Sequence, residues 1–137
     1  MNRYNMKRSE ATEQMRVIDW CRWHENRYPA LKLIYHIPNG GSRNKLEAQN
    51  LKAEGVKAGV PDLHLPVPAN SFHGLYVEMK WGKNKTTDNQ DWWLEELGRQ
   101  GYKTAICYSA EAALVEITKY LGIWEELKDK EPILQEV

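Results

Sequence analysis

The sequence predicts an α/β fold, with a small mixed central β-sheet flanked by helices. Segments with helical periodicity alternate along the chain with short segments of strand-forming residues, an order typical of mixed α/β domains. The chain has 137 residues, 42% of them hydrophobic, so it is long enough for one core and too short for two. We therefore expect a single domain over residues 1–137, with a loose basic arm at residues 1–8 and an acidic tail at residues 122–137.

The first two predicted elements are a helix and a strand. Met15 and Cys21 recur near helical spacing after Ser9, a residue type that caps helix N-termini, so we expect a helix over residues 10–26. Residues 31–36 alternate in polarity and are rich in strand-forming side chains, which predicts a strand.

The remaining elements are predicted from the same kinds of signal: capping residues before helices, glycine after them, and alternation within strands. In chain order we expect a polar helix at 43–54, strands at 62–65 and 74–80, a helix from 87 or 88 to 100, a strand at 103–108 and a helix at 110–121. The tail from Trp124 is expected to be helical in part. The predicted order is therefore α, β, α, β, β, α, β, α.

The composition excludes several classes of protein. Lys+Arg and Asp+Glu number 19 each, so the chain is not a polybasic binder, although a local basic face is compatible with zero net charge. Cys21 and Cys107 are too few for a disulfide framework or a four-thiolate zinc site. The sequence shows neither a signal-peptide pattern nor an apolar run of membrane-spanning length, so we expect an intracellular protein without a membrane partner.

Three residues that suit phosphodiester hydrolysis fall on neighbouring predicted strands. Strand alternation puts Glu78 and Lys80 on one face, with Met79 on the other. Asp62 begins the preceding strand, and the short connection between the two strands predicts that Asp62 lies beside Glu78. Two carboxylates, with the backbone carbonyl of Met79 in reach, suit a hard cation such as Mg²⁺, and a nearby lysine can position the attacking water.

These residues alone leave other interpretations open. Glu78 and Lys80 can pair with each other on a solvated strand face, as charges on strands often do. Asp62 and Glu78 can act as the acid and base of a different hydrolase, for example on a sugar, without needing the lysine. A zinc site built from His36, His64 and a carboxylate is also conceivable, although no ligand spacing in the sequence supports it.

Further motifs follow one another in a consistent order along most of the chain. They are Glu13-Gln14, Ile37–Gly41, Gly55–Leu63, Gly74–Lys80, Gln90, Trp93 and Gly101-Tyr102. With these motifs the chain resembles the virus-type replication-repair nuclease (VRR-NUC) family of the PD-(D/E)xK nuclease superfamily. The resemblance implies a restriction-endonuclease-like core.

The resemblance also implies roles for individual residues. Asp62 and Glu78 correspond to carboxylates that bind Mg²⁺ or Mn²⁺, and Lys80 corresponds to the catalytic lysine. Glu13 resembles the first-helix acid that completes the metal site. Spacing does not separate it from Glu10 on the same helical face, but Gln14 directly after Glu13 favours Glu13.

Gln90 resembles the glutamine that the family carries on a helix near the active site, where it bonds the lysine or a phosphate. The family often has Ser-Pro-Glu before this glutamine, whereas this chain has Thr87-Asp88-Asn89. The departure concerns the cap of the helix rather than the glutamine itself.

A set of residues with exposed amides or positive charge is predicted to contact nucleic acid. The set comprises Asn39, Gly40, Gly41, Arg43, Lys57, Lys83 and Lys85. Two glycines let a backbone approach phosphate closely, and lysines around the carboxylates would make binding salt-dependent. The alternatives are a plain tight turn and ordinary solvated helix faces.

Together these features predict a metal-dependent DNA endonuclease. The resemblance implies a structure-specific enzyme acting on Holliday junctions, flaps or other branched DNA, in phage or bacterial replication and repair, and hence in the cytoplasm. It further implies a homodimer, because two related cuts in a branched substrate need two-fold symmetry. A helicase or another replication protein is a possible partner, RNA is a possible substrate, and a non-cleaving nucleic-acid-binding module of the same fold is the alternative.

Overall fold

Four strands form one mixed sheet in the order β1-β2-β3-β4. The computed structural model describes residues 6–39 and 44–136. The strands are β1 (Tyr35–His36), β2 (Leu63–Leu65), β3 (Leu75–Met79) and β4 (Lys103–Cys107). β1 and β3 each pair antiparallel with β2, whereas β3 and β4 are parallel. The predicted α/β fold with a small mixed sheet is therefore confirmed.

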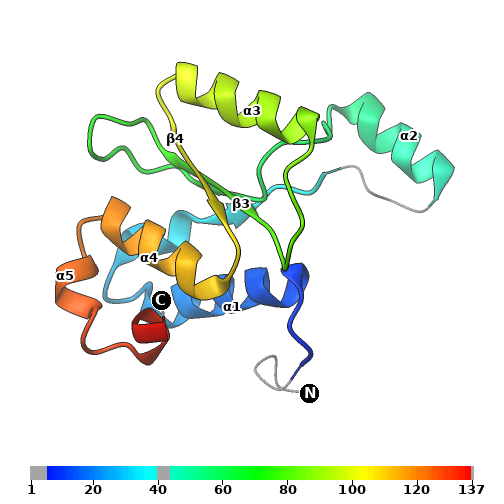
Figure 1. The fold of residues 1–137 in the computed structure, drawn as a ribbon. Helices are drawn as coiled ribbons and strands as arrows, with labels where there is room; N and C mark the ends of the chain where they lie inside the picture. The colour runs from blue at the N-terminus through cyan, green and yellow to red at the C-terminus, as the bar shows by residue number, and fades with distance from the viewer. Residues whose placement is uncertain (1–5, 40–43, 137) are drawn as a thin grey trace.

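Helices cover both faces of this sheet. They are α1 (Glu10–His24), α2 (Lys45–Glu54), α3 (Asp88–Arg99), α4 (Ala110–Tyr120) and the short α5 (Trp124–Leu127), with 3₁₀ turns η2 (Pro29–Leu33) and η3 (Pro132–Glu136). Figure 1 shows α3 on one side of the sheet and α1 and α4 on the other. The described part of the chain contains no helix with the length and apolar character that a membrane crossing requires.

The core lies between the sheet and the layer of α1 and α4. Alternate strand residues such as Leu63 and Val77 point to this side and are fully buried, together with Val17 from α1 and Ile117 from α4. Residues between them, such as Glu78, point to the opposite face, so the same alternation that builds the core directs the functional side chains away from it.

The predicted strand at 31–36 is wrong over most of its length. Pro29 begins a 3₁₀ turn, and only Tyr35 and His36 pair with β2. Leu31 is buried through this turn, whereas Leu33 is half exposed, so the alternating pattern reflects a turn at the sheet edge rather than an extended strand. Proline fixes φ near the value that a turn requires, which favours this conformation.

The acidic tail is part of the folded domain. Leu127 and Leu134 are each 2% exposed and belong to the core cluster. His24 of α1 contacts the carboxylate of Glu131 at 2.8 Å, which ties this segment to the first helix. Of the predicted N-terminal arm, residues 1–5 lie outside the described part.

Candidate active site

Three carboxylates converge at the end of β3. Glu10 from the first turn of α1, Asp62 just before β2 and Glu78 on β3 each offer an oxygen, and these oxygens lie within 4.8 Å of one another. Asp62 is 9% and Glu78 is 2% exposed, so two of the three acids are largely withdrawn from water. Within residues 6–39 and 44–136, it is the one group of three or more acidic, histidine or cysteine residues whose ligand atoms lie close enough together to hold a metal ion.

The sheet register explains how Asp62 and Glu78 meet. Leu63 pairs with Val77, so the antiparallel ladder places Asp62 across from Glu78. The Asp62 carboxylate accepts a hydrogen bond from the backbone amide of Met79 at 2.7 Å. The sequence prediction that Asp62 lies beside Glu78 therefore corresponds to the observed geometry.

The main chain of Asp62 is held as firmly as its side chain. Its carbonyl accepts hydrogen bonds from the backbone amide of Ile37 at 2.8 Å and from Nδ1 of His36 at 2.9 Å. Asp62 is thus held from one side by β1 and the residue after it, and from the other side by β3.

The electrostatics of this cluster favour a bound cation. Burial is the larger cause and the neighbouring charge of Asp62 the second, and together, against the opposing charge of Lys80, they raise the pKa of Glu78 to about 8. Burial and the charge of Asp62 also raise the pKa of Glu10. Among the described residues, Oε2 of Glu78 is buried and has no hydrogen-bond partner. Carboxylate oxygens are the ligands that a hard divalent cation prefers, and one of these oxygens is buried without a hydrogen-bond partner. A bound cation would offset the negative charge of the buried carboxylates.

Lys80 lies at the end of β3 and is 7% exposed. Its backbone amide donates to the carbonyl of Cys107 at 2.9 Å, so β4 continues to hold the chain beyond the last residue of β3. Because Lys80 lies two residues after Glu78 in this extended segment, both side chains belong to the same face of the sheet. The ammonium group is thereby kept near the carboxylates.

The structure places Glu10, not Glu13, with the strand carboxylates, contrary to the preference drawn from Gln14. Glu13 is fully buried and faces α4, where it accepts a hydrogen bond from the amide of Ala110 at 3.2 Å. Arg8 contacts it at 2.5 Å and Arg16 at 3.4 Å. Burial raises the pKa of Glu13, but the bonds from Arg8 and Ala110 outweigh this effect and leave the pKa below its ordinary value.

A sequence signal for this arrangement existed. Arg16 follows Glu13 by three residues, a spacing that pairs opposite charges on one helix. Trp81 directly follows Lys80, and the guanidinium carbon of Arg8 lies 5.3 Å from the centre of the Trp81 ring. Glu13 therefore holds the start of α1 to α4 through its bond with the first amide of that helix, and Arg8 links it to the segment that follows the lysine.

Gln90 lies in the first turn of α3, and its side-chain oxygen accepts a hydrogen bond from the amide of Thr87 at 2.9 Å. Thr87 in turn accepts from the amide of Gln90, so the two residues form a reciprocal capping box. The departure from Ser-Pro-Glu leaves the cap intact. Asn89 donates to the carbonyl of Ala58 at 2.9 Å, which fastens this turn to the segment leading to Asp62.

A comparison with known proteins identifies the family. The sequence profile of the VRR-NUC domain matches residues 8–111, which is more than half of the chain. This chain belongs to the VRR-NUC domain family. The resemblance seen in the sequence is thus confirmed, and the domain is of a nuclease type.

A solved structure supports the same assignment. A protein described as a VRR_NUC domain protein has a similar fold, with a TM-score of 0.72 and 27% sequence identity, over 86% of this chain and 92% of that chain. No curated protein matches this chain.

The residues predicted to contact nucleic acid are only partly described in this VRR-NUC domain. Asn39, Lys57, Lys83 and Lys85 are all exposed. Gly40, Gly41 and Arg43 lie outside the described residues. The exposed members of the set are available to a ligand, and their role in binding remains a prediction.

The histidines do not form the alternative zinc site. Nδ1 of His64 bonds the hydroxyl of Tyr35 at 2.7 Å, and Nδ1 of His36 bonds the carbonyl of Asp62. Among the described residues, the one cluster that could hold a metal ion consists of carboxylates alone.

Proposed function

We propose that this VRR-NUC domain is a metal-dependent DNA endonuclease that hydrolyses phosphodiester bonds. The observation that carries the proposal is the convergence of Glu10, Asp62 and Glu78 within 4.8 Å at the strand end that bears Lys80. Membership of a nuclease-type family supports the reaction class, and the donor chemistry supports a hard cation.

The carboxylates of Glu10, Asp62 and Glu78 would hold Mg²⁺ or Mn²⁺, together with the carbonyl of Met79. The amide of Met79 bonds Asp62, and the amide and carbonyl of one strand residue point to the same side, so this carbonyl faces the Asp62 side. A divalent cation supplies polarisation of the phosphate and a lowered pKa of water.

The side chains of this domain then orient the reactants. Lys80 donates hydrogen bonds that position the attacking water and offset the negative charge that develops on the phosphate. Gln90 uses its oxygen in the cap of α3, and its side-chain nitrogen can donate to a phosphate oxygen. Glu13 acts through the helix that carries Glu10, by anchoring that helix to α4.

The proposed substrate is branched DNA, such as a four-way junction or a flap, in phage or bacterial replication and repair. We further propose that two copies pair to present two sites, as two cuts in one branched substrate require. Exposed apolar side chains on the first helix, Met15 and Trp23, support α1 as part of such a contact. A helicase or another replication protein is a candidate partner.

The non-cleaving module is the main rival. A binding protein has no need of a buried carboxylate pair in which Glu78 is held with a raised pKa. A hydrolase that uses only Asp62 and Glu78 as acid and base would retain activity in EDTA and in the absence of Lys80.

The test is cleavage of labelled four-way junction, flap, nicked, duplex and single-stranded DNA, and of matching RNA, with Mg²⁺, Mn²⁺ or EDTA. We expect metal-dependent cleavage, fastest on a branched substrate, that is lost in Lys80→Ala. Lys119→Ala serves as a matched control, because Lys119 lies on α4 over Trp124 and away from the carboxylates. Binding without cleavage of any substrate would refute the enzyme and favour the module.

A further inference from the structure

A wide groove separates α2 from the first turn of α3. Its volume is about 710 Å³, and its lining includes Lys45, Lys52 and Lys57 together with Gln49 and Asn89. The described residues that line it include three lysines and no carboxylate. The groove therefore offers positive charge and amide groups to a ligand, although the chain as a whole is neutral.

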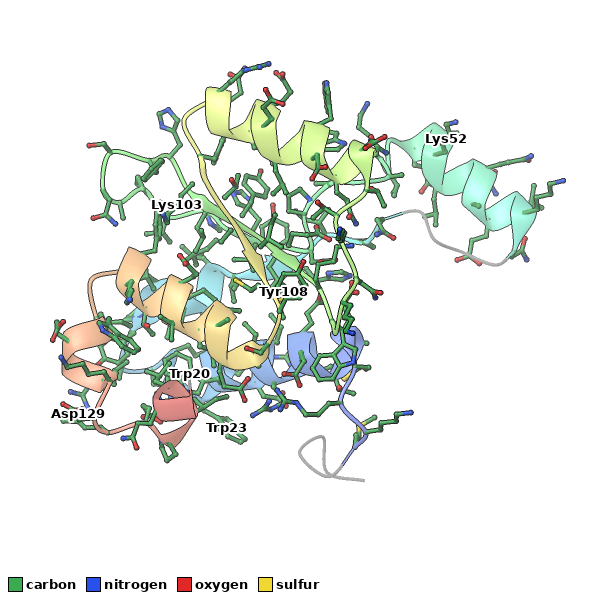
Figure 2. All side chains as sticks on the ribbon, viewed as in Figure 1. Trp20, Trp23, Lys52, Lys103, Tyr108 and Asp129 are labelled. Carbon is green, nitrogen blue, oxygen red and sulfur yellow. The ribbon has the colours of Figure 1, made fainter. Side chains whose placement is uncertain are left out.

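Helix α2 is built to stand away from the domain. None of its residues is buried, and Leu46 is 66% exposed. Figure 1 shows the helix projecting beyond the sheet, and Figure 2 shows side chains extending from it, with Lys52 labelled. A ten-residue helix gains most of its stability from packing, so a helix without a buried face is suited to gain contacts from a ligand.

The two ends of α2 are nevertheless defined. The side chain of Asn44 caps the N-terminus by accepting from the amides of Leu46 and Glu47. Gly55 ends the helix with φ of 109°, a left-handed conformation that suits glycine. Lys45 and Lys52 are therefore presented from a helix with defined ends, and Lys57 lies in the segment that follows it.

The wall of the groove lies close along the chain to the carboxylates. Asn89 on its wall bonds the carbonyl of Ala58, and Gly59 packs so closely that an added Cβ would lie 2.9 Å from the Asn89 side chain. Gly59 precedes Asp62 by only three residues, a span of at most about 11 Å. That span corresponds to the rise of about three nucleotides along one DNA strand.

We propose that this lysine groove binds the phosphate backbone of a duplex arm next to the cleaved bond, with α2 acting as a clamp. The inference rests on the proposed nuclease function, since it is that function which places DNA at the carboxylates. Three lysines in one groove can neutralise phosphates of one arm while the carboxylates engage the bond to be cut. The chemistry recognised is the polyphosphate backbone, without reading of bases.

The experiment measures the salt dependence of DNA affinity in EDTA, so that cleavage plays no part. A double variant, Lys45→Gln with Lys52→Gln, is compared with the wild type and with the charge-matched control Lys119→Gln with Lys130→Gln. Glutamine keeps helix propensity close to that of lysine, and circular dichroism checks that all three proteins are folded. The probes are a labelled duplex and a single strand of the same length.

The proposal predicts that the double variant reduces the slope of log K against log salt for duplex by roughly two, because each phosphate contact contributes about 0.9. The control variant should keep the wild-type slope. With the single-stranded probe, the slope should fall less in the double variant than it does with duplex. An unchanged slope in the double variant, an equal loss in the control, or a wild type that does not bind duplex would overturn it. Binding of labelled acidic polyglutamate to the wild type but not to the double variant, while the duplex slope stays unchanged, would instead assign the groove to an acidic protein partner.

Failure of the groove and failure of the proposed function are distinguishable. If the double variant shows the predicted reduction in salt slope but the wild type cleaves nothing in Mg²⁺ or Mn²⁺, the groove proposal is supported and the nuclease proposal is refuted. If the wild type cleaves DNA and the salt slope of the double variant is unchanged, the nuclease proposal is supported and the groove proposal is refuted.

Discussion

The backbone amide of Met79 donates a 2.7 Å hydrogen bond to the carboxylate of Asp62, so β3 itself orients the acid that faces Glu78. The bond is buried, and the amide has lost its place in the β2 ladder because β2 begins only at Leu63. Asp62 therefore has two roles: it accepts the hydrogen bond of the Met79 amide at the end of β3, and it presents an oxygen to the carboxylate cluster. Separate substitutions can divide these two roles.

Asp62→Asn should abolish cleavage while nearly keeping stability, because the amide oxygen still accepts from Met79. Asp62→Ala should also abolish cleavage, but it leaves the buried Met79 amide unpaired and should lower the free energy of unfolding by about 1–3 kcal/mol more. Urea denaturation of the two variants measures this difference. Equal stabilities would show that the Met79 bond does not hold the strand end.

The two acids of α1 should behave differently when each is changed to glutamine. Glu10→Gln should abolish metal-dependent cleavage with little change in stability, because Glu10 is partly exposed and its place is with Asp62 and Glu78. Glu13→Gln should lower the free energy of unfolding by about 2–3 kcal/mol, because Arg8 and Arg16 lose a buried partner. The loss is smaller than for a fully buried pair, since Arg8 is half exposed and both arginines keep Glu111. Urea denaturation and cleavage rates of both variants provide the measurement, and the reverse pattern would restore Glu13 as the metal acid.

Stability without metal should fall as the pH rises. The folded pKa of Glu78, about 8, is above the ordinary value of 4.5, so its contribution is complete below about pH 4.5 and is lost as the pH rises through about 8. We expect the free energy of unfolding in EDTA to fall by on the order of 3 kcal/mol between pH 5 and pH 9. Mg²⁺ or Mn²⁺ should reverse the loss, and Glu78→Gln should remove most of the pH dependence in EDTA. A flat profile for the wild type would contradict a raised pKa of Glu78 in the folded state.

Two glycines with positive φ give a matched test of the approach segment. At Gly59, φ is 89° and an added Cβ would lie 2.9 Å from Asn89, whereas at Gly55, φ is 109° and no atom lies within 4 Å of the added Cβ. Gly55→Ala should cost about 1 kcal/mol from backbone strain alone, and Gly59→Ala about 2–3 kcal/mol. Because Gly59 braces the turn that carries Gln90, only Gly59→Ala should also reduce cleavage by about tenfold. Thermal melting and cleavage rates test both, and equal effects at the two positions would contradict the close packing.

Much of the fold followed from the sequence because local signals and tertiary structure agree. Ser9 caps the helix for which it was predicted, and Thr87 and Ser109 cap the predicted helices that follow them. The alternation around Glu78 directs Val77 into the core and Glu78 to the other face. Where an element lies at an edge the agreement fails: the apparent strand at 31–36 is mostly a 3₁₀ turn, because a sheet edge imposes little pairing on it.

The candidate site was predictable to a similar extent. Register and chain connection were enough to place Asp62 beside Glu78, since both residues lie on adjacent strands. The choice between Glu10 and Glu13 was harder to predict, because the one local signal was Arg16 three residues after Glu13, whereas the deciding contact joins Glu13 to Ala110, far along the chain. The lysine groove was equally hidden, because it forms only when α2 and α3 come together in space.

Metal binding itself tests the account most directly. Titration of Mn²⁺, followed by the electron paramagnetic resonance signal of the free ion, reports binding without any nucleic acid. We predict one site per wild-type chain, a loss of that site in Glu78→Gln, and its retention in Glu13→Gln under conditions where that variant is folded. Undiminished Mn²⁺ binding by Glu78→Gln, or none by the wild type, would contradict the assignment of Glu10, Asp62 and Glu78 as a metal centre.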